Sequence, residues 1–403
     1  MTASLFATVE MAPRDPILGL NEQFNADTRS DKINLGVGVY FNEQGKLPVL
    51  RCVAAAEQLL LQTPKAKNYL PIDGIAAYDR AVQGLVFGAD SDVLKAGRVA
   101  TVQALGGTGG LKVGADFLRK LQPLAEVLIS DPSWENHRAL FTQAGLAVGT
   151  YPYYDPATRG IRFDDLLAAL QAAKPGTVVV LHACCHNPTG CDLNDVQWQQ
   201  TAAACKAGGL VPFLDMAYQG FGEGIDEDGA AVRWFLAAGI QFFVSTSFSK
   251  SFSLYGERVG ALSVVCSSSE EAQRVLSQLK IVIRANYSNP PTFGADVVAT
   301  VLTTPDLRAA WVAELAQMRD RIRQTRHALV SKLRDAGAEK APGDLDYITR
   351  QKGMFSYSGL STAQMQHLRS EFGVYGVDSG RICVAAINSR NIDAVAAALA
   401  QVM

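Results

Sequence analysis

The sequence predicts an α/β protein with two parts: a large domain built on a mostly parallel sheet flanked by helices, and a smaller α+β domain. Between residues 99 and 245, short apolar segments with strand character alternate with helical segments, as in a parallel sheet with helical crossovers. A long helical pattern over residues 306–333 then leads into a shorter set of helices and strands. Polar residues recur where the apolar segments end, which predicts one site along one edge of the sheet.

The composition is that of an ordinary globular protein. The chain has 403 residues, with 37 Lys or Arg, 39 Asp or Glu and a formal net charge of −2. This balance gives no broad attraction to nucleic acid or to an anionic membrane, so we expect neither partner. No apolar run approaches the ~20 residues of a membrane helix, and residues 1–13 lack the pattern of a signal peptide. Seven scattered cysteines therefore indicate reduced thiols and a cytoplasmic location.

The N-terminal part predicts an arm, a helix and a strand. Residues 1–15 lack periodicity, so we expect an extended arm that either frays or docks on a partner. A helix is predicted over residues 17–24, and residues 33–40 alternate like a strand. Gly38 within this strand favours either a simple bend or a close approach of the backbone to another group.

A Gly-rich turn follows the first strand of the large domain. Helices are predicted over residues 49–61 and 75–87, and a strand over residues 99–104. The turn Gly106-Gly107-Thr108-Gly109-Gly110 comes next and opens a helix over residues 111–121. Free amides at the start of such a helix point at a ligand, so this turn predicts an anion site. It lacks the Gly-Lys-Ser/Thr ending of a P-loop.

Three polar residues follow successive buried strands. Strands are predicted over residues 126–130, 147–151, 177–182, 210–214 and 242–245. Asn187, Asp215 and Lys250 come at or shortly after the ends of the last three. Because the ligand crevice of an open α/β sheet lies outside its strand ends, we expect these three side chains to share one site.

Lys250 lies in a Ser-rich segment, with Ser249 before it and Arg258 eight residues after it. A deprotonated lysine amine can form a Schiff base with an aldehyde, and hydroxyls with an arginine suit a phosphate. Together they predict pyridoxal phosphate, which carries both groups on one small molecule. A single lysine in a polar loop is more often a surface residue, so this prediction depends on the strand-end placement of the other residues.

The end of the chain predicts the smaller domain. A strand over residues 262–265 and a helix over 270–283 are followed by a break at residues 284–291. Beyond the long helix we expect a helix over residues 362–372, a strand pair around Tyr375 and residues 381–384, and a C-terminal helix from Ile392. The expected division is an arm of residues 1–15, a small domain of residues 16–47 and 320–403, and a large cofactor-binding domain of residues 48–319.

Several long motifs in order carry a resemblance over nearly the whole chain. They are DPILGL, INLGVGVY, KNYLPIDG, GGTGGLK, DPSWENH, CCHNPTG, DMAYQGF, SFSKSFSLYGERVG, IRANYSNPP, GMFSYSG and GRICVA. With them the chain resembles the fold-type I aminotransferases that use pyridoxal phosphate, and within these the aspartate and aromatic amino-acid group. The segments SFSLYGERVGALSVV and VFGAD…VLKAGRVAT look more like the bacterial aromatic (tyrosine) enzymes.

The resemblance implies roles for the residues around the cofactor. Lys250 would form the Schiff base and later move the proton between the substrate Cα and the cofactor carbon. Asp215 would pair with the ring nitrogen, which keeps the ring protonated as an electron sink, and His137 would support Asp215 from behind. Tyr218 and Asn187 would hydrogen-bond the phenolate oxygen.

The phosphate and the ring would be held by a further set. The resemblance assigns Trp134 to stacking on the ring and to the substrate side of the site. The expected phosphate ligands are Gly107, Thr108, Ser247, Ser249, Arg258 and, from the neighbouring subunit, Tyr69.

Two arginines would bind the substrate. Arg381 would hold the α-carboxylate in a two-pronged pair that lysine cannot match, with help from Asn187 and the Gly38 amide. Arg284 would reach across a homodimer to the distal carboxylate of aspartate or glutamate. In the aromatic group the corresponding arginine is thought to swing aside for a ring, so its presence does not exclude tyrosine or phenylalanine.

The expected function is the transfer of the amino group from tyrosine, phenylalanine or aspartate to 2-oxoglutarate, in a ping-pong cycle on a homodimer with shared active sites. The alternatives are a strict aspartate aminotransferase, a binding protein of the same fold that does not transaminate, and another reaction of the same cofactor. We expect no metal: adjacent cysteines at a strand end do not match the usual zinc spacings. The residues of ligand type in this segment are His182, Cys184, Cys185, His186 and Cys191.

Overall fold

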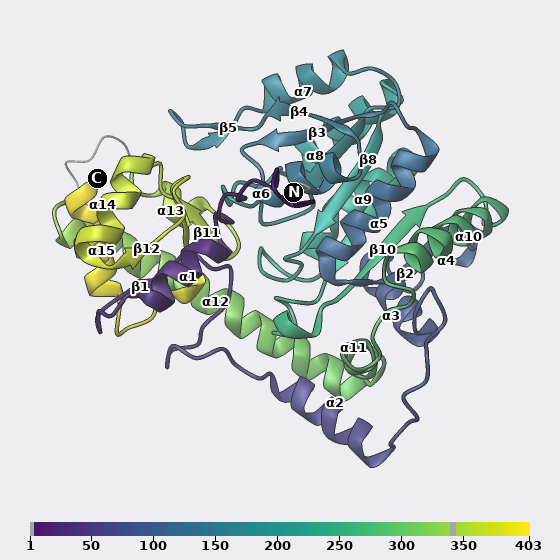
Figure 1. The fold of residues 1–403 in the computed structure, drawn as a ribbon, viewed down its shortest axis with the longest axis horizontal. Helices are drawn as coiled ribbons and strands as arrows, with labels where there is room; N and C mark the ends of the chain where they lie inside the picture. Colours follow the sequence, from purple (N-terminus) through teal and green to yellow (C-terminus); the bar gives the residue numbers. More distant parts are fainter. Residues whose placement is uncertain (1–3, 339–343) are drawn as a thin grey trace.

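A seven-stranded sheet forms the centre of the computed structural model, which describes residues 4–338 and 344–403. Its strand order is β2-β10-β9-β8-β7-β3-β4 (Figure 1). Only β10 (Val259–Val265) runs antiparallel to its neighbours, β2 (Val99–Leu105) and β9 (Phe242–Ser247). The other neighbouring pairs are parallel, which confirms the predicted mostly parallel sheet. The remaining strands of the sheet are β3 (Glu126–Asp131), β4 (Ala147–Pro152), β7 (Val178–His182) and β8 (Val211–Met216).

Helices cover both faces of this sheet, as the alternating pattern predicted. They are α3 (Ala76–Phe87), α4 (Asp92–Lys95), α5 (Gly106–Leu121), α6 (Glu135–Gln143), α7 (Phe163–Ala172), α8 (Asp195–Ala207), α9 (Ala230–Ala238) and α10 (Ser269–Asn286). The small hairpin β5 (Tyr154–Asp155) and β6 (Gly160–Ile161) lies beside them. Successive residues of a strand point to opposite faces, so in β7 Val178 and Val180 pack in one core whereas Val179 and Leu181 pack in the other.

A second, smaller part combines an N-terminal segment at residues 18–34 with the C-terminal part of the chain (Figure 1). β1 (Ile33–Asn34) pairs in parallel with β12 (Val374–Tyr375), and β11 (Phe355–Tyr357) pairs antiparallel with β13 (Arg381–Cys383). The helices of this part are α1 (Leu18–Ala26), α13 (Tyr347–Arg350), α14 (Thr362–Phe372) and α15 (Ile392–Val402).

One long helix joins the two parts. α12 (Pro305–Asp335) contacts α2 (Arg51–Gln62) and α11 (Phe293–Thr303) on the side of the large sheet, and α13 and α15 on the other side. The helix confirms the long helical pattern predicted over residues 306–333. The domain boundaries at residues 47/48 and 319/320 stay a prediction, and residues 1–3 of the arm and 339–343 of the small domain lie outside the described residues.

Four sequence predictions about local structure were wrong. The turn expected at residues 106–110 is the first part of α5, which begins at Gly106 and not at residue 111. The strand expected over residues 33–40 is limited to Ile33–Asn34. Beyond it the chain passes close to Leu20 at Gly36 and close to Phe355 at Gly38. The pattern break expected from residue 284 comes later, since α10 continues to Asn286. β12 pairs with β1 and not with the strand at residues 381–383.

Among the described residues, no helix is both long enough and apolar enough to cross a membrane.

Candidate active site

Pairing across the central strands brings the strand ends together. His182 of β7 lies opposite Asp215 of β8, and Asp215 lies opposite Ser245 of β9. The loops that leave β7 and β9 at this edge carry Asn187 and Lys250. The carboxyl ends of parallel strands meet at one edge, so the strand spacing alone is enough to place these residues together.

A cavity of about 520 Å³ opens at this edge. It is lined by most of the residues predicted for the site, namely Gly38, Gly107, Thr108, Trp134, Asn187, Asp215, Tyr218, Ser247, Ser249, Lys250, Arg258 and Arg381. Three predicted residues do not line it: His137, Tyr69 and Arg284. His137 lies behind Asp215, whereas Tyr69 and Arg284 are exposed on the surface of the chain.

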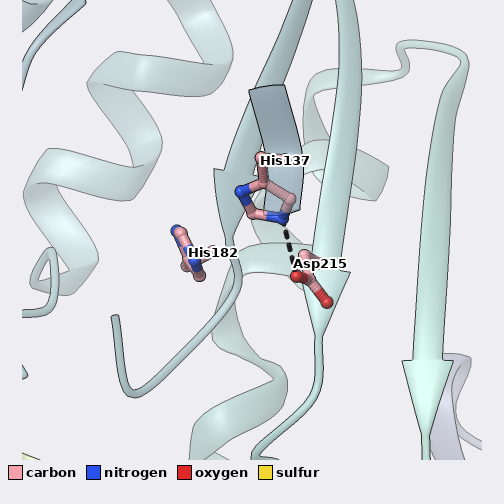
Figure 2. Close-up of side chains that lie close together, drawn as sticks. All are labelled: His137, His182 and Asp215. Carbon is pink, nitrogen blue, oxygen red and sulfur yellow. Dashed lines mark hydrogen bonds and ion pairs between the residues drawn. The ribbon is translucent and has the colours of Figure 1, made fainter. Parts of the chain in front are cut away.

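The carboxylate of Asp215 is buried against two histidines (Figure 2). His137 Nε2 lies 2.9 Å from Asp215 Oδ2, and His137 Nδ1 lies 2.9 Å from Ser133 Oγ. Burial alone would raise the pKa of Asp215, but the hydrogen bond and charge of His137 and the charge of Lys250 hold that pKa below its usual value. The group is therefore ionised at neutral pH and can pair with a protonated ring nitrogen.

His182 is a polar residue of the cavity that the sequence did not assign to the cofactor. Its ring lies 4.9 Å from that of His137, centroid to centroid, and neither of its nitrogens has a hydrogen-bond partner among the described residues. Burial lowers the pKa of His182 to about 3, so the ring is neutral. A buried ring without partners beside Asp215 is typical of a site that a polar ligand completes.

Lys250 is placed for amine chemistry. Its Nζ lies 4.8 Å from the centroid of the Tyr218 ring. Burial, together with the charges of Arg258 and Arg381, lowers the pKa of Lys250 to about 8 in spite of Asp215. A share of the amine is therefore neutral near pH 7, as a nucleophile requires. Burial raises the pKa of Tyr218, so its hydroxyl stays protonated and can donate to an anionic oxygen.

The start of α5 and Arg258 form a cradle for an anion. Gly107 and Thr108 lie in the first turn of α5, where amides lack intrahelical partners. Arg258 Nη1 donates to Ser249 Oγ at 3.2 Å, and Arg258 Nη2 lies where a Cβ on Gly106 would come within 2.5 Å of it. Amides, hydroxyls and a guanidinium that converge on one end of a cavity suit a phosphate.

Arg381 lines the same cavity. Its side chain is 1% exposed. Arg381 Nη1 donates to Asn187 Oδ1 at 3.0 Å and Nη2 to the Gly36 carbonyl at 2.9 Å, whereas Nε has no hydrogen-bond partner among the described residues. The guanidinium lies 4.3 Å from the centroid of the Phe355 ring. A Cβ on Gly38 would come within 2.7 Å of that ring, so glycine is needed where the chain passes it.

Several other lining residues were missed. Tyr255 accepts a hydrogen bond from the Tyr40 amide at 3.0 Å. The ring of Phe355 packs against the guanidinium of Arg381. Phe355 lies in the motif GMFSYSG, but no residue type or spacing there indicates chemistry. The others are Asp15, Pro16, Ile17, Leu18, Val37, Val39, Leu111, Glu135, Asn136, Ala139, His182 and Ala217.

Two clusters in the described residues have metal-ligand types within 4.8 Å of one another: His137, His182 and Asp215, and Cys184, Cys185 and Asp228. His137 uses both ring nitrogens on Ser133 and Asp215. The carboxylate of Asp228 accepts three amides of the loop at residues 220–223. In both clusters one of these residues is already hydrogen-bonded to other groups, and the absence of a metal stays a prediction.

The fold and this cavity define a class of protein. Residues 30–399 match the family described as aminotransferase class I and II, and the chain belongs to this family.

Relatives with this architecture cover the chain almost completely. An aspartate aminotransferase of Pseudomonas aeruginosa is 60% identical over 99% of this chain and 100% of its own length. An aromatic-amino-acid aminotransferase of Escherichia coli is 53% identical, with the same coverage. The crystal structure of an aromatic-amino-acid aminotransferase from Burkholderia pseudomallei, covalently bound to pyridoxal phosphate, has 64% identity and a TM-score of 0.96 and covers 99% of this chain and 100% of that one.

The residues present here fit that cofactor. The cradle at the start of α5 offers donors for a phosphate, Lys250 offers an amine, and Asp215 offers an ionised carboxylate in the same cavity. His182, whose nitrogens have no hydrogen-bond partner among the described residues, adds a polar group to its lining.

Proposed function

We propose that this aminotransferase uses pyridoxal phosphate to move the amino group of an aromatic amino acid or of aspartate to 2-oxoglutarate. The observation that carries the proposal is the single cavity that contains Lys250, Asp215, Arg258 and Arg381. These residues supply an amine, a carboxylate for the ring, a phosphate ligand and a carboxylate receptor, which is the full set that the chemistry needs.

The roles of the residues follow from their positions. Arg258, Ser247, Ser249 and the amides of Gly107 and Thr108 would hold the phosphate. Asp215, oriented by His137, would hold the ring nitrogen, and Trp134 would lie against the ring. Tyr218 and Asn187 would donate to the phenolate oxygen. Bound in this way, pyridoxal phosphate withdraws electrons from the substrate Cα and makes its proton acidic.

Lys250 carries the proton in this proposal. Its Nζ lies inside the cavity, and burial lowers its pKa to about 8. Beside a bound substrate this amine would take the proton from the substrate Cα and return it on the cofactor side, because a base works best when its pKa is close to the working pH. The reverse transfer would serve 2-oxoglutarate, the second substrate of the cycle.

Arg381 would bind the α-carboxylate. The cation is buried and its Nε has no hydrogen-bond partner in the part of the chain that the structure describes, so a substrate carboxylate would satisfy it. Relatives named for aspartate and for aromatic amino acids stand at 60% and 53% identity, which supports both donor classes. A strict aspartate enzyme is the narrower alternative.

We also propose that the protein is a homodimer whose two active sites each use residues of both subunits, and that it is located in the cytoplasm. Tyr69 is 87% exposed, and Arg284 at the end of α10 is exposed too. Apolar side chains of the arm, among them Leu5 and Met11, are exposed as well. A second copy that covers these surfaces would bring Tyr69 and Arg284 to the neighbouring cavity. All seven cysteines are free, which supports a reducing compartment.

Borohydride reduction tests the central role of Lys250. Reduction of the protein with its cofactor should attach the label to Lys250, as located by peptide mapping, and label on another lysine would overturn the proposal. Lys250→Ala should abolish transamination. Lys332→Ala, which removes an exposed lysine paired with Asp393, should leave it unchanged. Normal cofactor binding without any keto-acid formation would favour the binding-protein alternative.

Donor preference is tested by kcat/KM for aspartate against phenylalanine. Comparable values support the broad proposal, and activity with aspartate alone supports the strict enzyme.

Shared sites are tested with hybrid dimers. Lys250→Ala and Arg284→Ala subunits are each expected to fail with aspartate, but their mixture should regain activity, because one site of the hybrid has both residues. A mixture that stays inactive although hybrids form would show that each chain builds its own site.

A further inference from the structure

The loop that carries Asn187 is held by a carboxylate outside the cavity. Asp192 Oδ2 accepts the Cys185 amide at 2.7 Å, and Asp192 Oδ1 accepts the His186 amide at 2.8 Å. Both oxygens of one carboxylate thus bind the two consecutive amides that immediately precede Asn187. Asp192 does not line the cavity.

The backbone at this point needs such support. Cys185 has a φ of +51°, a left-handed conformation that a residue with a side chain adopts only at a cost of ~1–2 kcal/mol. Hydrogen bonds to a charged acceptor are among the stronger ones and can hold this conformation. Burial raises the pKa of Asp192 to about 6, so the group is ionised at neutral pH and can accept both bonds.

The rest of the loop is fixed by other means. The His186 ring lies between Ser130 Oγ and Thr189 Oγ1, at 2.9 and 2.8 Å, and stacks on Tyr153 at a centroid distance of 4.0 Å. The Lys352 amide donates to the Gly190 carbonyl at 2.7 Å. These contacts anchor the ring of His186 and the far end of the loop, whereas Asp192 sets the direction in which the chain enters Asn187.

Asn187 connects this loop to a residue of the cavity, since its Oδ1 accepts a hydrogen bond from Arg381. A turn of the loop would move the amide of Asn187 away from both Arg381 and the position expected for the cofactor's phenolate oxygen.

We propose that Asp192 is a positioning residue of the active site, which acts on Arg381 and on the cofactor only through the backbone of residues 185–186 and the side chain of Asn187. This inference rests on the proposed aminotransferase function. A carboxylate that served only the stability of the loop would affect unfolding but not these two partners of Asn187.

The test is a double-mutant cycle of Asp192→Ala and Asn187→Ala in the holoenzyme. Two quantities are measured: the pH midpoint of the visible absorption band of the bound cofactor, and KM for the amino acid. Each single substitution should raise both the pH midpoint and KM. For Asp192→Ala we expect KM to rise about tenfold, which corresponds to ~1.4 kcal/mol. In the Asn187→Ala background, Asp192→Ala should change neither quantity further. Equal changes in both backgrounds would overturn the inference.

Two further variants sharpen the cycle. Asp192→Asn keeps one acceptor oxygen and should give an intermediate midpoint. If the alanine variant does not fold, the cycle is run with Asp192→Asn. Asp155→Asn is the matched control, because Asp155 also accepts two backbone amides, of Ala157 and Thr158, in an exposed turn away from the cavity. It should leave the midpoint and KM unchanged.

Amide hydrogen exchange gives a readout that does not depend on activity. Peptides with residues 185 and 186 should exchange faster in Asp192→Ala than in the parent protein. Faster exchange with an unchanged midpoint would show a structural role only and overturn the inference. If the parent holoenzyme itself lacks the visible band, the proposed function fails, and this outcome is distinct from an additive cycle.

Discussion

The guanidinium of Arg258 lies against the bare Cα of Gly106: a Cβ at residue 106 would come within 2.5 Å of Nη2. The Gly106 amide also donates to the Arg258 carbonyl at 2.9 Å. The two residues fix each other, and between them they orient the cradle at the start of α5.

Gly106→Ala is therefore expected to weaken cofactor binding by displacing Arg258. It adds a backbone cost as well, since Gly106 has a φ of +68°. Gly88→Ala separates the two effects: Gly88 has a φ of +83°, but a Cβ there would meet nothing within 4 Å. Both variants should lose ~1–2 kcal/mol of unfolding free energy, and only Gly106→Ala should release the cofactor on dialysis. Equal cofactor retention would contradict the assigned contact.

Arg381→Lys should lose most of the affinity for the substrate carboxylate. A lysine cannot reach Asn187, the Gly36 carbonyl and a carboxylate in one plane as the guanidinium does. We expect KM for the amino acid to rise at least tenfold, by the loss of one charge-assisted bond of ~1.5–3 kcal/mol. Arg334→Lys, at an exposed ion pair with Asp346, is the control and should leave KM unchanged. A small effect of Arg381→Lys would mean that another group binds the carboxylate.

Cofactor capture should depend on pH through Lys250. The neutral amine attacks the aldehyde, and its fraction grows as the pH rises through about 8. The rate at which the cofactor-free protein takes up pyridoxal phosphate should therefore increase between pH 6.5 and about 9 and then level off, as followed by absorbance. A rate that is flat over this range would indicate that the amine is not the group that limits capture.

His137→Phe should destabilise the cofactor-free protein by ~1–3 kcal/mol, because it takes a donor from the buried carboxylate of Asp215. Ser133→Ala removes only the bond on the far side of the His137 ring and should cost less. Denaturant unfolding at pH 7 measures both.

The same pair predicts the sign of a pH effect. The pKa of Asp215 is lower in the folded protein than its usual 3.8, so its contribution to stability is present above about pH 4 and is lost as the pH falls through the folded pKa. The difference between the parent protein and His137→Phe should therefore shrink below pH 4. A difference that persists there would assign the effect to packing of the ring.

The central part of the site could be predicted from the sequence because it depends on local rules. Asn187, Asp215 and Lys250 follow buried parallel strands, and such strands end at one edge of the sheet. Arg381 differs: it contacts Asn187 across 194 residues of chain. No pattern of spacing indicates that contact, and only the resemblance assigned a role to Arg381.

The errors in the fold lie where tertiary packing decides. β1 and β12 are two-residue strands, too short to show a period, so nothing in either sequence names the other as its partner. α10 continues through Arg284 and ends at Asn286, three residues beyond the end that the sequence predicts. His182 and Phe355 were missed as site residues because a buried histidine or phenylalanine looks like core in any sequence.

Because β8 pairs with a strand on each side, insertions and deletions within it should not be tolerated. Asp215 faces the cavity because β8 is in register with His182 of β7 and Ser245 of β9. A single residue inserted into Val211–Met216 would turn the Asp215 side chain to the other face of the sheet, where Leu214 and Met216 pack. The exposed turn between β5 and β6 has no such constraint. Insertions and deletions among functional descendants of this chain should therefore collect in turns of that kind and avoid the central strands.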